Sequence, residues 1–378
     1  MNQTNTGLMA ARLVIHAGTH KTASTYIQDR LFQNRTKLSE QGFIYDYPKG
    51  TKTFKLLARD LCKGNWNPLK THLNSHKDKG KNLLISAEQF AVPLNDPKTL
   101  RALQRLAQKK GYELEVVIFI RTQLDYINSR YTYSLRRFYH SQTFEEFLEA
   151  AIRGCLPGES HERGVIQKRG DLFDFWRYFQ PLLNARRKGL KLQFIPFRQN
   201  NQDPFDQFLE QLGLPSNESW TQGSQRSYNR SPGIRGVWLS RLLSRKLQEQ
   251  GISHRRIEGS SKIILKEEAW RGWTDPSFWG FNRARTRSTY AHFQAHNQRF
   301  AKEVWGCPWD KAFPNDQQVL ERKRCRYRPM SLNEELRMHA IADHLVRMIE
   351  HRCHPQPWHL VSDSVEKLLS RLQPTLVA

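Results

Sequence analysis

The sequence predicts an α/β protein in which helices flank a parallel β-sheet. Four short apolar segments, suited to strands buried on both faces, alternate with amphipathic helical patterns, as is typical of parallel sheets. Hydrophobic residues make up 38% of the chain and include 20 Phe and 10 Trp, which indicates a packed core rather than a disordered chain. The 378 residues are enough for one large domain or two ordinary ones.

Strands and helices are expected in strict alternation through the first half of the chain. The predicted strands are RLVIHA near the amino terminus, KNLLISA (81–87), LEVVIFI (114–120) and LKLQFIPF (190–197). The first predicted helix runs from Ser24 to Glu40, with Gly42 just beyond it, and the second follows Arg121. A third begins at Asp171 in DLFDFWRYFQPLL. The fourth, DPFDQFLEQLGL (203–214), begins at Asp203-Pro204 and ends at Gly213.

The organisation changes past about residue 215. A basic helix is expected from Ile234 to about Gln250, whereas 252–287 is rich in Arg, Trp and Gly, shows no period and is interpreted as an insertion or a long functional loop. A helix around YAHFQAHNQRFAKEVWG closes a main domain placed at 8–315. A helical C-terminal extension, 316–378, follows, with one helix from Ser331, where Glu334 completes a capping box, and another at SVEKLLSRL.

The formal net charge of +24 implies a polyanionic partner: nucleic acid, an acidic glycan, an anionic membrane or a highly charged cofactor. Five Cys, an odd number without a CxxC pair, favour a reducing compartment over a disulfide framework. No segment reaches the roughly 18–20 apolar residues of a membrane span, and the apolar patch from Leu8 to Ile15 is interpreted as the first strand rather than a signal peptide. We therefore expect a soluble, cytoplasmic protein.

The first strand leads into a loop, Lys21-Thr22-Ala23-Ser24-Thr25, that is laid out to hold an anion. Open α/β folds bind ligands at the carboxyl edge of the sheet, and the N–H groups and dipole of the following helix favour negative charge there. The lysine and the hydroxyl groups add a fixed charge and donors. The GxxxxGK[ST] spacing of a nucleoside triphosphatase is absent. The alternative is a basic turn whose Ser and Thr only cap the helix.

A second element follows the third predicted strand, where Arg121 stands at the strand end and Ser129 lies on the next helix. A triphosphatase would often place an acidic residue there to hold Mg²⁺. An arginine instead offers charge-assisted bonds to a second phosphate, so no metal site is predicted. The alternative pairs Arg121 with Asp125 in a structural ion pair.

These stretches together resemble the sulfotransferases that use 3′-phosphoadenosine 5′-phosphosulfate (PAPS). HAGTHKTASTYIQ is similar to their HxGxxKTGTTxxQ loop, and RTQLDYINSRY to their 3′-phosphate element. LLISAEQF, TFEEFLEAAI, DLFDFWRYF, FIPFRQNNQDPFDQFLEQLGL and HNQRFAKEVWG resemble segments of the carbohydrate-type members, in the same order, over most of 12–312. The resemblance implies a P-loop nucleoside triphosphate hydrolase-like fold and a metal-independent transfer of a sulfuryl group.

The resemblance also implies roles for individual residues. The cofactor would be held by Lys21, Thr22, Ala23, Ser24, Thr25, Arg121, Ser129 and, from the loop SYNRSPG, Arg230. Lys21 would stabilise charge on the bridging oxygen. Glu88, just past a strand end, is the first candidate for the general base, with a raised pKa, unless it pairs with Lys21 or a surface Arg. His20 is the second candidate. Ala23 stands where the family has Gly, which is tolerable if the helix has already begun there.

The acceptor is expected to be a saccharide or glycolipid, because Trp270, Trp273 and Trp279 lie among Lys and Arg in the 252–287 segment, and those cations favour an acidic one. Those aromatics could instead pack a side core. Two other functions stay open: a P-loop small-molecule kinase, which Arg121 argues against, and a basic nucleic-acid-binding protein, for which no reader motif is found. HRCHPQPWH (351–359) invites a zinc interpretation, but its two Pro and the lack of a second ligand cluster argue against one.

Overall fold

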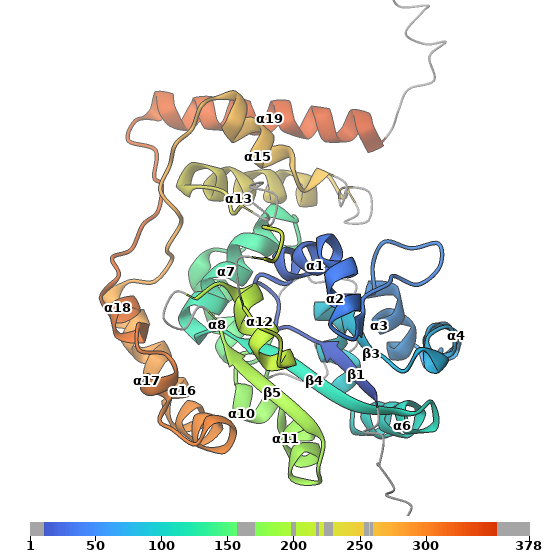
Figure 1. Cartoon of the computed structure of the whole chain (residues 1–378). Helices are drawn as coiled ribbons and strands as arrows, with labels where there is room; N and C mark the ends of the chain where they lie inside the picture. The colour runs from blue at the N-terminus through green and yellow to red at the C-terminus, as the bar shows by residue number, and fades with distance from the viewer. Residues whose placement is uncertain are drawn as a thin grey trace, which may run out of the picture.

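The computed structural model describes residues 11–156, 171–197, 202–216, 219–222, 230–252, 257 and 260–353. Its centre is a five-stranded sheet of order β2-β3-β1-β4-β5 in which every neighbouring pair is parallel (Figure 1). The strands are β1 (Ala11–His16), β2 (Phe43–Ile44), β3 (Asn82–Ser86), β4 (Tyr112–Ile120) and β5 (Lys191–Pro196).

The four predicted strands are confirmed, and with them the α/β class. Their apolar runs are buried because helices cover both faces of a parallel sheet. The edge strand β2 was missed, since its two residues are too short to give a periodic signal.

Helices surround the sheet along the whole chain. Before β4 they are α1 (Ser24–Gln33), α2 (Arg35–Glu40), α3 (Lys55–Cys62), α4 (Asn67–Asn74), η1 (Lys77–Lys79), η2 (Glu88–Phe90), α5 (Ala91–Leu94) and α6 (Pro97–Lys109). After it come α7 (Gln123–Arg136), α8 (Phe144–Ile152), α10 (Phe175–Tyr178), α11 (Gln180–Arg187), α12 (Pro204–Leu212), α13 (Ile234–Glu249), α15 (Ile263–Trp270), α16 (Arg283–Trp305), α17 (Trp309–Ala312), α18 (Asp316–Glu321) and α19 (Leu332–Cys353).

The single helix predicted from Ser24 to Glu40 is wrong, because the chain breaks at Asn34 into α1 and α2. The Asn34 amide donates to the carbonyl groups of Arg30 (2.8 Å) and Thr221 (3.1 Å), and its oxygen accepts from the Thr221 N–H (2.8 Å). A partner far along the chain therefore sets the break, which no local pattern could indicate.

The helix predicted from Asp171 is likewise divided, into α10 and α11. The helix predicted behind Arg121, the one at 203–214 and the basic helix after Ile234 are confirmed as α7, α12 and α13. The interpretation of 252–287 as a long loop is wrong for its described part, since it contains α15 and the start of α16, whereas the alternative of an insertion stays a prediction. SVEKLLSRL lies outside the described residues.

Two apolar cores are present. The larger surrounds the sheet, and the smaller lies between α13, α15 and α19, with Leu243, Ile264 and Ile349 among its buried members. Figure 1 shows these three helices as a layer beyond the sheet, with α13 packed on α7. The domain boundary at 315/316 stays a prediction. No helix among the described residues is both long and apolar enough to cross a bilayer.

Candidate functional site

The carboxyl ends of β1, β3 and β4 meet at one edge of the sheet. In the register, His16 is the partner of Ser86 on β3 and of Val117 on β4. The segments that leave these three strands carry Lys21, Glu88 and Arg121, so residues about a hundred positions apart reach the same edge.

Both neighbouring strands hold the loop between β1 and α1 in place. The Arg121 guanidinium donates from Nη1 to the carbonyl oxygen of Lys21 (3.1 Å), and the Glu88 carboxylate lies 3.0 Å from His20 Nδ1. Arg121 also lies 3.7 Å from Asp125, the structural pair considered as an alternative. The loop is thus fixed in shape before any ligand arrives.

The backbone of this loop is strained at two positions. Lys21 (φ 69°) and Ala23 (φ 59°) are in the left-handed region, where a non-glycine residue is disfavoured by about 1–2 kcal/mol. The condition under which alanine would be tolerable at position 23, a helix already begun there, is not met: Ala23 is the left-handed N-cap residue before α1. Strain of this kind clusters at ligand sites, and turns that use left-handed residues can point successive N–H groups at an anion.

The start of α1 brings two buried polar atoms without partners close to the loop. No side chain caps the helix and no acidic residue stands in its first turn. The Ser24 hydroxyl is buried and has no hydrogen-bond partner among the described residues, and the same holds for Nε2 of His16. A Cβ at Gly18 would lie only 2.9 Å from Ser24 Oγ, so a larger residue there would crowd this hydroxyl. Donors at a helix N-terminus can form a cradle suited to a phosphate or sulfate oxygen.

Positive charge is concentrated around Lys21. Burial, together with the nearby charges of Arg136, Arg121 and Arg130, lowers the pKa of Lys21 to about 8 against the opposing effect of Glu88. Lys21 Nζ lies 5.2 Å from the centre of the Tyr133 ring, and the guanidinium carbons of Arg130 and Arg136 lie 5.8 and 5.9 Å from it. An anion bound here would relieve repulsion between these cations.

Sequence reasoning missed Tyr133, Arg130 and Arg136. Ser129, Tyr133 and Arg136 are spaced i, i+4 and i+7 on α7, which places them on one side of the helix that follows Arg121. This spacing of a hydroxyl, an aromatic ring and a cation on one side of the helix was the sequence signal that could have identified Tyr133 and Arg136.

The raised pKa expected of Glu88 is wrong. Burial alone would raise it, but His20, Lys55 and Arg130 together lower the pKa of Glu88 to about 2. The partner foreseen for an ion pair was Lys21 or a surface Arg, and the structure has His20 instead. Glu88 is therefore a fixed anion that holds the proton on His20 Nδ1, which leaves the imidazole rather than the carboxylate suited to accept a proton at Nε2.

The remaining predicted residues lie around this cradle. Thr22 is buried and donates to the Thr19 carbonyl (2.6 Å), whereas Thr25 is exposed on the first turn of α1. Ser129 is half-buried on α7. Arg230 is exposed, and its carbonyl accepts from Arg136 Nη1 (3.0 Å), which brings the chain before α13 to the cationic cluster. Residues 227–229 of SYNRSPG lie outside the described residues.

The tryptophans proposed to stack on a sugar do not form one surface. Trp279 is fully buried, and Trp273 packs against the smaller core with Arg235 4.8 Å from its ring. Only Trp270 is exposed, at 75%. Packing thus uses two of the three rings, as the alternative interpretation held.

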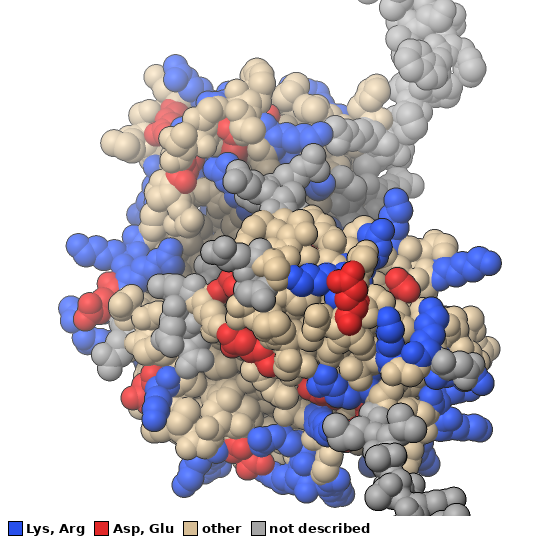
Figure 2. Space-filling model, in the orientation of Figure 1, with Lys and Arg blue, Asp and Glu red and all other residues tan. Residues whose placement is uncertain are grey.

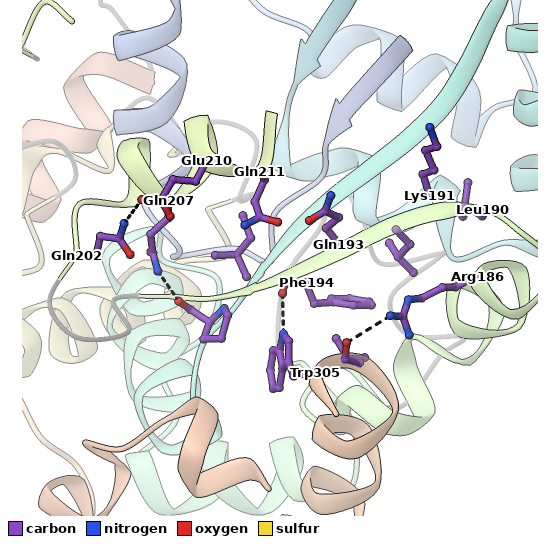
Figure 3. A pocket seen from close by; sticks show the side chains of 14 residues that line it. Arg186, Leu190, Lys191, Gln193, Phe194, Gln202, Gln207, Glu210, Gln211 and Trp305 are labelled. Atoms are coloured by element: carbon purple, nitrogen blue, oxygen red, sulfur yellow. Dashed lines mark hydrogen bonds between the residues drawn. The ribbon is translucent and has the colours of Figure 1, made fainter. Parts of the chain in front are cut away.

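A groove of about 540 Å³ runs along the free edge of β5, between α11, α12 and the end of α16 (Figure 3). Several polar groups that line it bond to backbone carbonyl groups: Trp305 Nε1 donates to the Phe194 carbonyl (2.7 Å) and Gln207 to the Pro196 carbonyl (3.1 Å), whereas Gln207 Oε1 is buried without a partner among the described residues. These bonds cover the exposed edge of the sheet. None of the predicted site residues lines this groove.

Among the described residues, no group of three or more His, Cys, Asp or Glu is arranged to hold a metal ion. In the segment HRCHPQPWH (351–359), the residues from His354 onward lie outside the described part of the chain.

Comparisons with protein-family models, with curated proteins and with solved structures each find no match. The resemblance to sulfotransferases therefore rests on the sequence motifs alone. A proposal about function has to be argued from the geometry of the loop between β1 and α1.

Proposed function

We propose that this chain is a PAPS-dependent sulfotransferase with a P-loop-type sheet and loop. It would move a sulfuryl group from PAPS to a hydroxyl or amine of a saccharide or glycolipid acceptor. The observation that carries the proposal is the loop at the end of β1, where a strained backbone, the orphaned Ser24 hydroxyl and the uncapped start of α1 face a cluster of cations.

The residues present fit the charged end of this donor. An oxygen of the 5′-phosphosulfate would be received by the N–H groups of the first turn of α1 and by Ser24 Oγ. Lys21, with a pKa lowered to about 8, would recover its full charge beside the anion. Arg121, Arg130 and Arg136 supply further positive charge for a 3′-phosphate, and the Tyr133 ring lies beside Lys21, Arg130 and Arg136.

The chemistry assigns separate work to the chain's own residues. PAPS supplies an activated sulfuryl group whose S–O bond to the 5′-phosphate breaks as the acceptor oxygen or nitrogen bonds to sulfur. Lys21 and the N–H groups of α1 stabilise the charge that grows on the departing phosphate. His20, held by Glu88 at 3.0 Å, would take the acceptor's proton at Nε2.

Calorimetric titration with 3′-phosphoadenosine 5′-phosphate, with AMP and ATP–Mg²⁺ alongside, tests the proposal. We expect the 3′-phosphorylated nucleotide to bind more tightly than the other two. Arg121→Ala should lose at least about tenfold in affinity, because a charge-assisted bond to phosphate is removed. The matched control is Arg101→Ala, which removes an exposed arginine of α6 and should bind like the wild type. Preference for ATP–Mg²⁺ would instead establish the kinase alternative.

The assignment of the base has its own test. His20→Ala should lower the transfer rate by at least about a hundredfold, and Glu88→Gln by less, since the amide oxygen can still accept from Nδ1. With an imidazole base, the wild-type rate should fall on acidification, because a protonated imidazole cannot take the proton of the acceptor. If Glu88, with its pKa of about 2, were the base, the rate would hold down to strongly acidic pH and Glu88→Gln would be the more damaging change.

A further inference from the structure

Large apolar side chains are left in water at the carboxyl-terminal end of the described chain. Seven such side chains are exposed among the described residues, and four of them fall within residues 330–348. The exposed fractions are 94% for Met330, 70% for Leu332 and 57% for Leu336. Single exposed apolar residues are ordinary, but a cluster of this kind marks a binding surface.

These side chains are not needed to hold the fold together. The opposite side of α19 supplies Met338, Ala342 and Leu345 to the smaller core. Leu332 and Leu336 are four residues apart, so they lie on the same side of this helix, one turn from each other. Figure 1 shows α19 as the outermost helix of its layer.

The chain that leads into α19 carries a basic strap, residues 322–328. Arg322, Lys323, Arg324 and Arg328 are all exposed on it. Figure 1 shows this segment rising along one flank of the molecule to the start of α19, and Figure 2 shows blue side chains gathered on that flank.

The strap is held in a defined conformation. Cys325 exchanges two backbone hydrogen bonds of 2.9 Å with Trp279, and Arg326 donates to the Gly280 carbonyl (2.5 Å) and to Glu145 (2.9 Å). Two of its exposed cations also contact the protein: Arg324 donates to Glu145 (3.0 Å), and the guanidinium carbon of Arg322 lies 4.4 Å from the centre of the Trp279 ring.

The charge of the strap is only partly balanced. Arg285, Arg324 and Arg326 all contact the same carboxylate, that of Glu145. Burial lowers the pKa of Arg324, and so do the neighbouring charges of Arg326 and Arg328. Glu334 is already used by Tyr327 (2.7 Å) and by the Met330 N–H (2.7 Å). Glu335 is the exposed acidic residue at the start of α19, and a positive surplus remains around it.

A lipid surface has an anionic headgroup layer and an apolar acyl-chain layer, and the strap cations and the exposed apolar side chains suit these two layers respectively. Apolar residues insert at the boundary between headgroups and acyl chains, while cations are attracted to anionic headgroups. A polyanionic chain such as an acidic glycan or a nucleic acid would use the cations but gives Met330 and Leu332 no apolar environment.

We propose that the basic strap, together with Met330, Leu332 and Leu336, docks this protein on the surface of an anionic phospholipid membrane. The docking surface lies apart from the loop at the end of β1, so the inference goes beyond the proposed function and does not depend on it.

Co-sedimentation of the full chain with vesicles tests the inference. The vesicles are a phosphatidylglycerol–phosphatidylcholine mixture and phosphatidylcholine alone, each at low and high salt. One variant replaces the four exposed strap cations with Gln. Its matched control replaces four exposed cations of α6 with Gln, namely Lys98, Arg101, Arg105 and Lys109. A third variant carries Met330→Gln, Leu332→Gln and Leu336→Gln, with Leu56→Gln, 44% exposed on α3, as its control.

We expect binding to the mixed vesicles that salt weakens, and little binding to phosphatidylcholine alone. The strap variant should lose roughly a hundredfold in partitioning, because each cation near an anionic surface contributes severalfold. The apolar variant should lose roughly tenfold. Both controls should bind like the wild type, and circular dichroism should show that every variant is folded.

Three outcomes would overturn the proposal. The wild type could fail to sediment with anionic vesicles at low salt. The α6 control could lose as much binding as the strap variant, which would mean that net charge alone is responsible. The apolar variant could keep full binding while a sulfated polysaccharide displaces the vesicles, in which case the surface serves a polyanionic chain instead.

Discussion

Two regions at this sheet, the groove beside β5 and the loop at the end of β1, differ in backbone strain and in electrostatic repulsion. In the groove of about 540 Å³, the Trp305 indole donates to the Phe194 carbonyl (2.7 Å), although Gln207 Oε1 is buried without a partner among the described residues. The loop at the end of β1 holds two left-handed non-glycine residues, a buried hydroxyl without a partner and cations that repel one another. Backbone strain and perturbed charges cluster at ligand sites, so they favour the loop over the groove as the candidate site.

The largest expected effect comes from removing the central cation of the loop. On the proposed function, Lys21→Met should lower the transfer rate by at least about a hundredfold, because charge on the departing phosphate loses its nearest ammonium. Initial rates at saturating PAPS measure this. Lys109→Met, on the exposed side of α6, is the control and should be fully active. Equal activity of the two variants would remove the reason for treating the loop as the site.

The same substitution should raise the free energy of unfolding at neutral pH. The folded-state pKa of Lys21 is about 8 against an ordinary value of 10.5, so below pH 8 the fold holds a disfavoured charge. From about pH 8 to 10.5 the unfolded chain binds more protons, and wild-type stability therefore rises with pH relative to Lys21→Met. We expect an advantage for the variant of about 1–3 kcal/mol at pH 7, shrinking towards pH 10. Urea unfolding at both pH values measures it, and a constant difference would contradict the prediction.

A substitution in the groove beside β5 should lower the free energy of unfolding, whereas Lys21→Met in the loop should raise it. Trp305→Phe removes the donor to the Phe194 carbonyl and part of a packed indole, and should lower the free energy of unfolding by about 1–2 kcal/mol. Affinity for 3′-phosphoadenosine 5′-phosphate should not change. Denaturant unfolding and calorimetry measure the two quantities. A severalfold change in nucleotide affinity would show that the groove and the loop are not independent.

The smallest expected effect is at Ala23. Ala23→Gly removes the left-handed penalty (φ 59°) but adds backbone entropy to the unfolded chain, so a gain in unfolding free energy of about 0.5–1 kcal/mol is expected. Ala102→Gly, within α6, is the control and should lose a similar amount because its backbone is helical. Thermal unfolding distinguishes the two. A loss at Ala23 as well would mean that the loop is not strained there.

The sequence by itself determined the frame of the protein. Apolar runs of strand length, separated by helices with start and stop signals, predicted β1, β3, β4 and β5, because both kinds of signal lie within a few residues of the element they specify. The same locality placed Lys21, Glu88 and Arg121 at one sheet edge, since each directly follows a parallel strand.

Only the tertiary structure decided what those residues became. His20 and Arg130 on α7 keep Glu88 ionised. The left-handed turn at Ala23 belongs to a loop that Arg121 holds through the Lys21 carbonyl, and the helix break at Asn34 depends on its hydrogen bond with Thr221. Arg121 and Lys21 are 100 residues apart when they bond. Electrostatic and packing energies depend on distance in space, whereas sequence patterns report distance along the chain, and the chemistry of this site is set by the former.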